Sequence, residues 1–158
     1  MLPSILGNRA FVGAGVLMAH RRENASWQVL LFRRAIEPDR GRWSVVGGRQ
    51  EHGETSGQTA LREAAEEAFG SRRPEVFAER LAAYLPERFD IAACRSTNLW
   101  LPGLFQYRTF LVEFTREVPL DAFTPNWESD ACRWFSASHL PPDAHRGVRW
   151  TVWCLGLA

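Results

Sequence analysis

The sequence lacks both a surplus of one charge and a long apolar segment. Its 19 basic residues are balanced by 18 acidic ones, so the formal net charge is only +1. This balance excludes a protein that holds nucleic acid or an anionic membrane surface by bulk electrostatic attraction. The longest apolar run, at residues 10–19, is about half the length of a membrane span. We therefore expect no membrane partner, and nucleic acid is disfavoured as a partner.

Cysteine is scarce and forms no recognisable pattern. Cys94, Cys132 and Cys154 are odd in number and widely spaced, without a CxxC pair or a histidine at zinc-ligand spacing. A disulfide framework and a structural zinc site are therefore excluded, and we expect buried thiols in a reduced, cytoplasmic protein. Residues 1–10 contain no basic start followed by an apolar stretch and a cleavage site, so we expect no secretory signal.

The length of 158 residues and the 46% share of hydrophobic residues are typical of one domain, here residues 1–158. Alternating strand-like and helix-like segments predict an α/β fold in which helices cover a mixed sheet. The segment 86–106 has no clear period and is interpreted as an excursion that shapes a binding pocket. We expect strands at 11–18, 27–32, 43–46, 78–85, 108–114 and 131–135, and helices at 55–69 and 145–157.

The helix predicted at 55–69 has Thr55 or Ser56 to cap its start and Gly70 where a helix usually ends. At about 100° per residue, its two sides differ chemically. One side carries small apolar residues that allow a close approach to a sheet, namely Leu61, Ala64, Ala65 and Ala68. The opposite side carries three carboxylates at spacing i, i+3 and i+4, namely Glu63, Glu66 and Glu67.

Three carboxylates on one side of a helix are either a solvated surface or a cation site. Glu63 and Glu67 repel each other at i, i+4 spacing, and no basic residue follows any of the three acids four positions later. Arg62 reaches Glu66 only in the less favourable order, so the cluster keeps an excess of negative charge. A hard divalent cation would offset this excess, because magnesium and calcium take carboxylate and carbonyl oxygens.

A loop with several glycines leads into this helix. It starts at the pair Gly47 and Gly48 and runs to Glu54, and such a pair lets the backbone turn sharply or approach a ligand closely. A carbonyl near Gly47 would add an uncharged oxygen ligand to the acidic side of the helix. An ordinary turn with acidic residues near a helix N-terminus is the alternative.

Loop and helix together resemble a known family. Gly48, Glu54 and the run Arg62-Glu63-Ala64-Ala65-Glu66-Glu67 follow the signature of the Nudix hydrolases at matching spacing. The resemblance implies the fold of that family, an α/β/α sandwich with a mixed sheet. It also implies hydrolysis of the pyrophosphate linkage in a nucleoside diphosphate derivative, with water as nucleophile and Mg²⁺ or Mn²⁺ as cofactor. Divalent ions suit this chemistry, because they neutralise the pyrophosphate and lower the pKa of bound water.

The sequence departs from the family signature at three positions. Ala64 stands where a bulky aliphatic residue is usual, and Phe69 and Gly70 look like a local swap at the end of the helix. None of the three lies on the acidic side. The segments 43–47 and 133–135 also look like the family's pattern, so the resemblance extends beyond the motif.

The resemblance implies a role for each residue of the motif. The implied metal ligands are Glu63, Glu66, Glu67 and the carbonyl of Gly47. Arg62 with Glu54 would form an ion pair that orients the glutamates, and Gly48 would give structural support. The general base is either Glu63 or a later acid, for which Glu128 is the candidate and Asp130 a weaker one; a solvated loop acid is the alternative for Glu128.

Substrate-binding residues outside the motif are less specific. Arg34, Arg49 and Arg33 are candidates to meet phosphates, or else are exposed charges without a special role. Trp100 and Trp127 could supply a stacking surface for a base or sugar, although most of the seven tryptophans are expected in the core. The histidines have no metal spacing and are expected at the surface or at helix caps; they are His20, His52, His139 and His145.

Two other functions remain open beside hydrolysis of a small nucleotide derivative. A catalytically silent nucleotide-binding or metabolite-binding regulatory module of the same fold would bind its ligand without turnover. Hydrolysis of RNA ends would need a basic groove, for which the net charge of +1 gives no sign. The sequence does not set the oligomeric state; a homodimer stays open, because dimers are common among proteins that resemble this one.

Overall fold

The computed structural model describes residues 10–158 of the chain. Residues 1–9, on which the expectation of no secretory signal largely rests, lie outside that range. The strands are β1 (Phe11–Arg21), β2 (Trp27–Arg34), β3 (Trp43–Ser44), β4 (Val46–Arg49), β5 (Ser96–Leu101), β6 (Phe105–Phe114) and β7 (Ser129–Ser136). The helices are α1 (Ser56–Phe69), α2 (Glu75–Leu81) and α3 (Arg146–Cys154), with short 3₁₀ turns η1 (Ile91–Ala93) and η2 (Leu120–Ala122).

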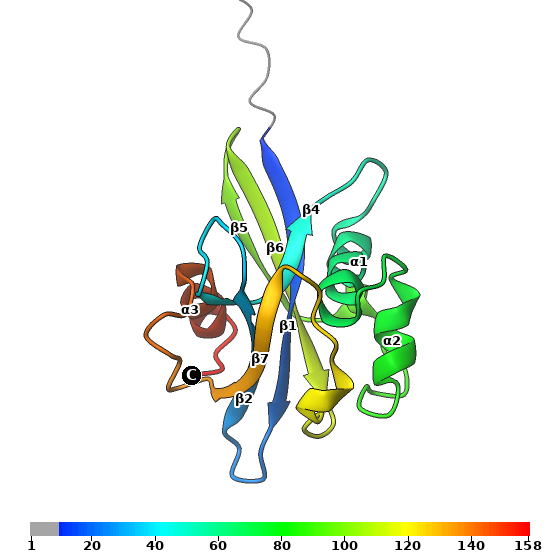
Figure 1. Cartoon of the computed structure of the whole chain (residues 1–158), viewed down its shortest axis with the longest axis vertical. Coiled ribbons are helices and arrows are strands. Elements are labelled where there is room, and N and C mark those ends of the chain that lie inside the picture. The colour runs from blue at the N-terminus through cyan, green and yellow to red at the C-terminus, as the bar shows by residue number, and fades with distance from the viewer. Residues whose placement is uncertain (1–9) are drawn as a thin grey trace, which may run out of the picture.

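The strands form one mixed sheet, which confirms the predicted α/β class. Its order is β3-β2-β1-β6-β5, with β4 added to β1 and β7 added to β2. The pair β1 and β6 is parallel and the other pairs are antiparallel. The long β1 pairs with β4 along Gly13–Val16 and with β2 along Met18–Arg21. This split of β1 places β4 beside α1 (Figure 1).

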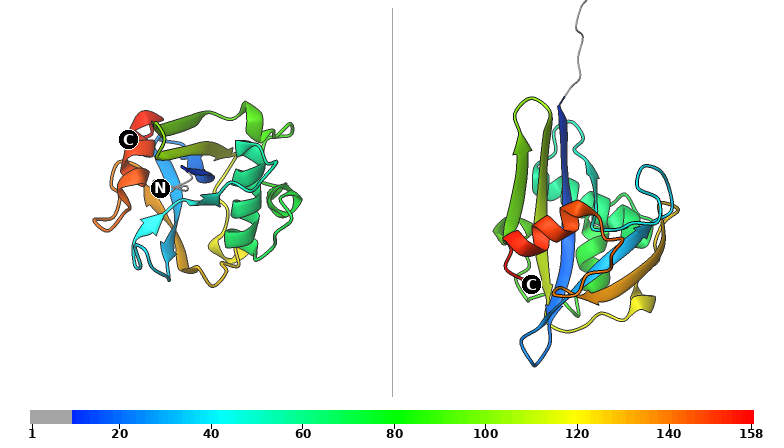
Figure 2. Two further views of the ribbon diagram at one scale, coloured as in Figure 1. Left: turned by 90° about the horizontal axis from the view of Figure 1, so that it is seen from above. Right: turned by 90° about the vertical axis from the view of Figure 1, so that its left-hand side faces the viewer.

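Helices cover both faces of the sheet, as expected of an α/β/α sandwich. Figure 2 shows α1 and α2 on one side and α3 on the other. The small apolar side of α1 is fully buried against the first face, with Ala60, Ala64, Ala65 and Ala68 all 0% exposed. On the second face, Val148 and Val152 of α3 and the following residue Leu155 pack against side chains of β1 and β2. Each face therefore has its own apolar core.

Local signals set both ends of α1. Thr55 caps the start, and its side chain and that of Gln58 form a reciprocal capping box. Gly70 ends the helix in the left-handed region at φ 68°, where glycine is favoured. Gly57 in the first turn is explained by packing, because a Cβ there would lie 3.0 Å from Cγ2 of Ile91.

One predicted element is wrong, and a second has regular structure that was not expected. The strand expected at 78–85 is instead the end of α2 and a following turn; the spacing of Phe77, Leu81 and Leu85 is helical, and all three are buried. The excursion expected at 86–106 contains β5, which pairs antiparallel with β6. No helix within residues 10–158 has both the length and the apolar character to cross a membrane.

Several expectations about burial also need correction. Cys154 is exposed rather than buried, and Cys94 and Cys132 are only half-buried. His20 is buried, with 4% of its surface exposed, whereas His145 caps α3 as expected. Among the seven tryptophans only Trp43 is fully in the core, and Trp100, Trp127 and Trp153 are exposed.

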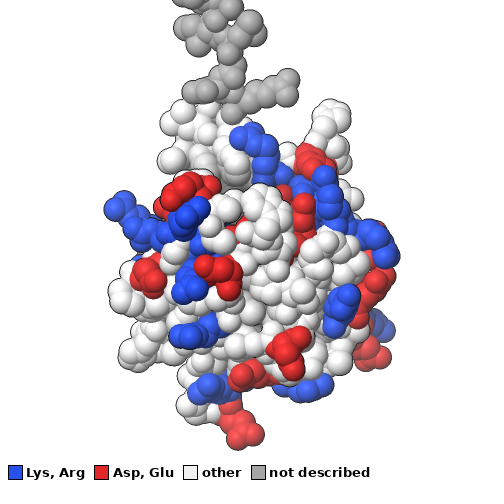
Figure 3. All heavy atoms as spheres, viewed as in Figure 1, with Lys and Arg blue, Asp and Glu red and all other residues white. Residues whose placement is uncertain are grey.

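On the face seen in Figure 3, acidic and basic side chains are interspersed.

Candidate active site

The glycine pair of β4 separates two clusters of side chains. Gly48 faces α1, where a Cβ would lie 2.6 Å from the carboxyl carbon of Glu63. Gly47 faces the opposite side of the strand, where a Cβ would overlap the hydroxyl of Tyr107. The backbone N–H of Gly47 donates to Oε1 of Glu67 at 2.9 Å. Only residues without side chains allow β4 to lie this close to both neighbours.

Arg62 joins the loop to the acidic side of α1. Its Nε donates to Oε1 of Glu54 at 2.6 Å, and its Nη1 donates to Oε1 of Glu63 at 2.8 Å. Its Nη2 donates to the carbonyl of Arg49 at 3.0 Å. The Arg62 side chain is 8% exposed, so these charge-assisted bonds are shielded from water. The hydrogen bond with Glu54 raises the pKa of Arg62, and Arg62 lowers the pKa of Glu54 to about 2.

Further bonds to Glu54 fix the loop at the start of α1. Its Oε2 accepts from the hydroxyl of Thr59 at 2.7 Å and from the backbone N–H of Glu51 at 3.0 Å. The side chain of Gln50 donates to its carbonyl. The ion pair that the family resemblance implied is therefore the centre of a network that spans the loop and two turns of helix.

The three acids of α1 lie in different environments. Glu67 is 5% exposed, and burial raises its pKa to about 8. The charges of Glu128 and Glu63 add to this rise, and the bond from Gly47 opposes it. Burial also raises the pKa of Glu63, whose side chain is 14% exposed. A fully solvated surface is therefore the wrong interpretation of this side of the helix, although Glu66 is the most accessible of the three.

Backbone hydrogen bonds hold Glu128 next to this acidic cluster. The N–H of Thr124 donates to the carbonyl of Ala68 at 2.8 Å, and the N–H of Asn126 donates to the carbonyl of Glu67 at 3.0 Å. The side chain of Asn126 then accepts from the N–H of Glu128 at 3.0 Å. The loop before β7 is thereby attached to the end of α1. The sequence placed Glu128 near the site by resemblance, and this attachment is the physical reason for its position.

Asp130 and Arg33, the weaker candidates, are engaged with each other. Nε of Arg33 donates to Oδ1 of Asp130 at 2.7 Å, and both side chains are roughly half exposed. Neither residue lines the pocket described below. The structure therefore separates them from the other candidates.

The acidic cluster has the donor chemistry of a divalent metal site but not a closed cage. Within the described part of the chain, no three acidic, histidine or cysteine side chains converge to hold a metal ion. Glu63 and Glu66 instead lie within 3.5 Å of Arg62, and Glu67 accepts from Gly47. Carboxylate oxygens suit Mg²⁺ and Mn²⁺, and a cation would offset the burial of Glu63 and Glu67. The residues present therefore fit a divalent ion.

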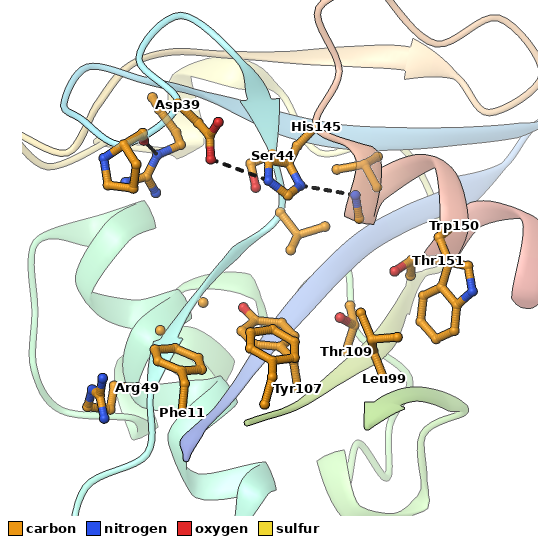
Figure 4. Close-up of a pocket in the computed structure, with 18 of the residues that line it drawn as sticks. Phe11, Asp39, Ser44, Arg49, Leu99, Tyr107, Thr109, His145, Trp150 and Thr151 are labelled. Carbon is orange, nitrogen blue, oxygen red and sulfur yellow. Dashed lines mark hydrogen bonds and ion pairs between the residues drawn. The ribbon is translucent and has the colours of Figure 1, made fainter. Parts of the chain in front are cut away.

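A pocket of about 510 Å³ adjoins the cluster (Figure 4). Its size suits a ligand of small-molecule dimensions. Its polar side is formed by Arg34, Gly47, Gly48, Arg49 and Glu128. Its other walls are mainly apolar and aromatic and include Phe11, Leu99, Phe105, Tyr107, Val148 and Trp150. The excursion expected to shape a pocket does so through Leu99 and Phe105.

An aromatic stack forms one wall of this pocket. The rings of Phe11 and Phe105 are 5.5 Å apart and those of Phe105 and Tyr107 are 6.1 Å apart, with interplanar angles of 13° and 11°. The guanidinium of Arg49 lies 4.7 Å from the centroid of the Phe11 ring. Sequence reasoning missed this stack. Its signal was the pair Gly13 and Gly15 within an apolar strand, which indicates close approach of a neighbouring group.

A second feature missed in the sequence closes another edge of the pocket. Nε2 of His145 lies 3.4 Å from Oδ2 of Asp39, and its Nδ1 accepts from the N–H of Gly147 at 3.0 Å. Figure 4 shows this contact between the loop after β2 and the start of α3. His145 therefore caps α3, as expected, and also links the helix to the loop after β2. No local sequence pattern indicates this second contact.

The structure thus sorts the predicted site residues into two adjoining groups. The loop and helix network holds Gly47, Gly48, Glu54, Arg62, Glu63, Glu66 and Glu67. The pocket wall holds Arg34, Arg49 and Glu128.

Solved structures of Nudix hydrolases resemble this fold. RenU, a Nudix hydrolase from M. smegmatis, is 21% identical and covers 94% of this chain and 84% of its own, with a TM-score of 0.62. The Ap4A hydrolase of C. elegans is 16% identical and covers 91% of this chain and 95% of its own, with a TM-score of 0.63. A NUDIX hydrolase from Nitrosomonas europaea is 27% identical and covers 94% of this chain and 69% of its own, with a TM-score of 0.56.

Sequence comparison points the same way. No curated protein matches the chain at a significant level. The sequence model of the NUDIX domain, however, matches residues 10–154, which is most of the chain. The match includes the glycine pair, the acidic helix and the loop that carries Glu128. The chain therefore belongs to the Nudix hydrolase family and is a pyrophosphohydrolase of the Nudix type.

Proposed function

We propose that the chain hydrolyses the pyrophosphate linkage of a small nucleotide-derived substrate, with water as nucleophile and Mg²⁺ or Mn²⁺ as cofactor. The observation that carries this proposal is the pair of carboxylates beside a pocket of about 510 Å³, with Glu67 buried and the side chain of Glu63 only 14% exposed. Burial raises the pKa of both carboxylates although Arg62 bonds Glu63, so ionising the pair is costly without a further cation. Their position between helix and pocket supports a role in catalysis rather than in folding.

The proposed metal ligands are the carboxylates of Glu63, Glu66 and Glu67 and the carbonyl of Gly47. A bound divalent ion supplies charge neutralisation at the phosphates and a lower pKa for water. Arg62 orients Glu63 by the 2.8 Å bond and anchors it to the loop through Glu54. Gly48 provides the space that the Glu63 carboxylate occupies.

We propose Glu128 as the general base that accepts the proton of the attacking water. It lines the pocket, and its charge acts on both Glu63 and Glu67. Glu63 is the alternative base. The bond from Arg62 already occupies one oxygen of Glu63, which makes Glu63 the weaker candidate. If Glu128→Gln loses turnover but still binds metal, Glu128 is the base. If Glu63→Gln behaves in this way and Glu128→Gln stays active, Glu63 is the base.

Arg34 and Arg49 are the proposed phosphate-binding residues. Both line the pocket next to the glycine pair. Nε of Arg34 donates to the carbonyl of Pro38 at 2.8 Å, which holds the guanidinium at the pocket wall. Similarity in fold to an Ap4A hydrolase supports a nucleotide-derived substrate without identifying it.

The decisive experiment is a substrate panel with identification of products. Purified protein is incubated with dinucleoside polyphosphates, nucleotide sugars, ADP-ribose and nucleoside triphosphates, with and without Mg²⁺ or Mn²⁺. We expect metal-dependent release of phosphate or nucleoside monophosphate, and products formed in ¹⁸O-labelled water reveal which phosphorus is attacked. Glu67→Gln should be inactive, whereas Glu79→Gln, on the exposed side of α2, should match the wild type.

The regulatory module is the competing function, and the same panel separates the two. It predicts tight binding of one compound with no turnover of any, in wild type and Glu67→Gln alike. Such a result would overturn the proposed activity.

A further inference from the structure

The ring of Tyr107 packs against the backbone of three glycines. A Cβ at Gly13 would lie 3.0 Å from Cδ2 of Tyr107, and a Cβ at Gly15 would lie 2.6 Å from its hydroxyl oxygen. A Cβ at Gly47 would overlap the same hydroxyl. Two strands, β1 and β4, therefore lack side chains at the positions that this ring covers. The hydroxyl is directed toward the glycine pair of β4.

The other side of the ring is held as well. In the parallel pair β1 and β6, Tyr107 is opposite Gly13, and Phe11 is opposite Phe105. The ring of Tyr107 stacks on Phe105 and lies 6.4 Å from that of Phe11, with interplanar angles of 11° and 13°. With glycines beneath it and aromatic rings beside it, the ring cannot turn away without disturbing the pocket wall. The hydroxyl therefore has a fixed position.

This hydroxyl is available to a ligand. Within residues 10–158 it forms no hydrogen bond, and the charged groups that act on it are Glu67, Glu63 and Arg34. A phenol hydroxyl can donate one hydrogen bond, and no group of the described fold accepts it here. A phenol lining a pocket without a partner is costly unless a ligand or water satisfies it. An acceptor that enters between the acidic cluster and the aromatic wall would do so.

We infer that the Tyr107 hydroxyl binds a phosphate oxygen of the substrate at the point where the pocket meets β4. This inference rests on the proposed function, because it identifies a further substrate-binding residue of the same site. Arg34 and Arg49 contribute charge at the polar side, whereas Tyr107 contributes a donor at a fixed position. The ring face and the hydroxyl together would orient the substrate, with the diphosphate toward the acidic helix and the remainder toward Leu99 and Trp150.

The test is Tyr107→Phe, with Tyr84→Phe as the matched control. Tyr84 is the only other tyrosine of the chain, and its ring lies against Arg116, away from the pocket. Phenylalanine keeps the contact of the ring with the three glycines and removes only the hydroxyl. We expect kcat/KM of Tyr107→Phe to fall about 10- to 100-fold, as for loss of a hydrogen bond to a charged group. The melting temperature and the kcat/KM of Tyr84→Phe should remain those of the wild type.

A binding measurement separates this inference from the proposed activity. Imidodiphosphate, a pyrophosphate analogue, is titrated calorimetrically into each protein in the presence of Mg²⁺. We expect about tenfold weaker binding to Tyr107→Phe and unchanged binding to Tyr84→Phe. Equal affinity for wild type and Tyr107→Phe overturns the inference, whether or not any substrate is hydrolysed.

The remaining outcomes are also decisive. If the wild type hydrolyses no compound of the panel but binds imidodiphosphate through Tyr107, the proposed activity fails and the phosphate contact stands. If the wild type does not bind imidodiphosphate, the contact is refuted. A lower melting temperature of Tyr107→Phe, with no selective loss of phosphate binding, assigns Tyr107 to the core instead.

Discussion

The backbone N–H of Gly47 lies 2.9 Å from Oε1 of Glu67. This single bond connects β4 to the buried part of the acidic helix α1. It gives one oxygen of Glu67 a partner within the fold, and the residue is only 5% exposed. One backbone donor offsets only part of the cost of burying a charge, so the folded protein contains a group that is expensive to ionise.

The first prediction follows for Glu67→Gln. The pKa of a glutamate exposed to water is 4.5, and burial raises that of Glu67 in the folded protein to about 8. A carboxyl with a raised folded pKa binds its proton more tightly when folded, so stability is lost as pH rises from 4.5 through about 8. Glutamine keeps an acceptor for Gly47 and cannot ionise. In EDTA, Glu67→Gln should therefore melt at a higher temperature than the wild type at alkaline pH.

Melting curves recorded across this pH range check the prediction. The difference between the two proteins should be several kcal/mol, about 5 at most, at high pH and should shrink as pH falls toward 4.5. The same variant should lose metal-dependent turnover, so stability and activity change in opposite directions. A difference in melting temperature that does not vary with pH would contradict this account.

A second prediction concerns acid unfolding and Glu54. Its pKa is lowered from 4.5 to about 2, chiefly by the hydrogen bond from Arg62. A lowered folded pKa contributes stability that is fully present above 4.5 and is lost as pH falls through about 2. Glu54→Gln should cost about 2–3 kcal/mol at neutral pH, and less than that at pH about 3.

Urea unfolding at the two pH values measures this change. Glu79→Gln is the matched control, because its partner Arg73 lies 3.4 Å away and both side chains are more than half exposed. That exposed pair should contribute little at either pH. Equal destabilisation of Glu54→Gln at both pH values would show that the ion pair with Arg62 is not the source.

Much of the site could be predicted because its information is local. The capping box at Thr55, the alanine face and the acidic spacing all lie within α1, so sequence order alone brings them together. The stack of Phe11 on Phe105 joins positions 94 residues apart, and the pairing of Asp39 with His145 joins two loops. Such contacts depend on strand order in the sheet, which local patterns do not encode.

Short elements show the same limit. The segment that includes Phe77 and Leu81 is compatible with a strand if a period of two residues is assumed. The spacing of four residues between these two buried side chains instead indicates a helix. Packing against α1 decides between strand and helix. The helical spacing brings Val76, Phe77 and Leu81 into the same apolar core as the alanines of α1. This packing partner is not visible from the segment itself.

Arg62→Lys is a third prediction. Lysine keeps the charge but has no planar fork, so it cannot bond Glu54, Glu63 and the carbonyl of Arg49 at once. We expect kcat to fall about 10- to 100-fold, as when a group that orients a ligand residue is removed. Steady-state kinetics should show KM much less affected. Wild-type kcat in Arg62→Lys would mean that charge alone is sufficient.

The last prediction tests the space that Gly48 leaves. An added methyl group would lie 2.6 Å from the carboxyl carbon of Glu63, so Gly48→Ala must displace that carboxylate or the strand. Overpacking of this kind costs about 1–3 kcal/mol of stability, and turnover should fall because a proposed metal ligand moves. Shortening the acid in the double variant Gly48→Ala/Glu63→Asp removes the clash. The double variant should regain stability relative to Gly48→Ala, whereas Glu63→Asp alone should not be stabilised. If the two substitutions are instead additive in urea unfolding, Gly48 and Glu63 are not in the contact described.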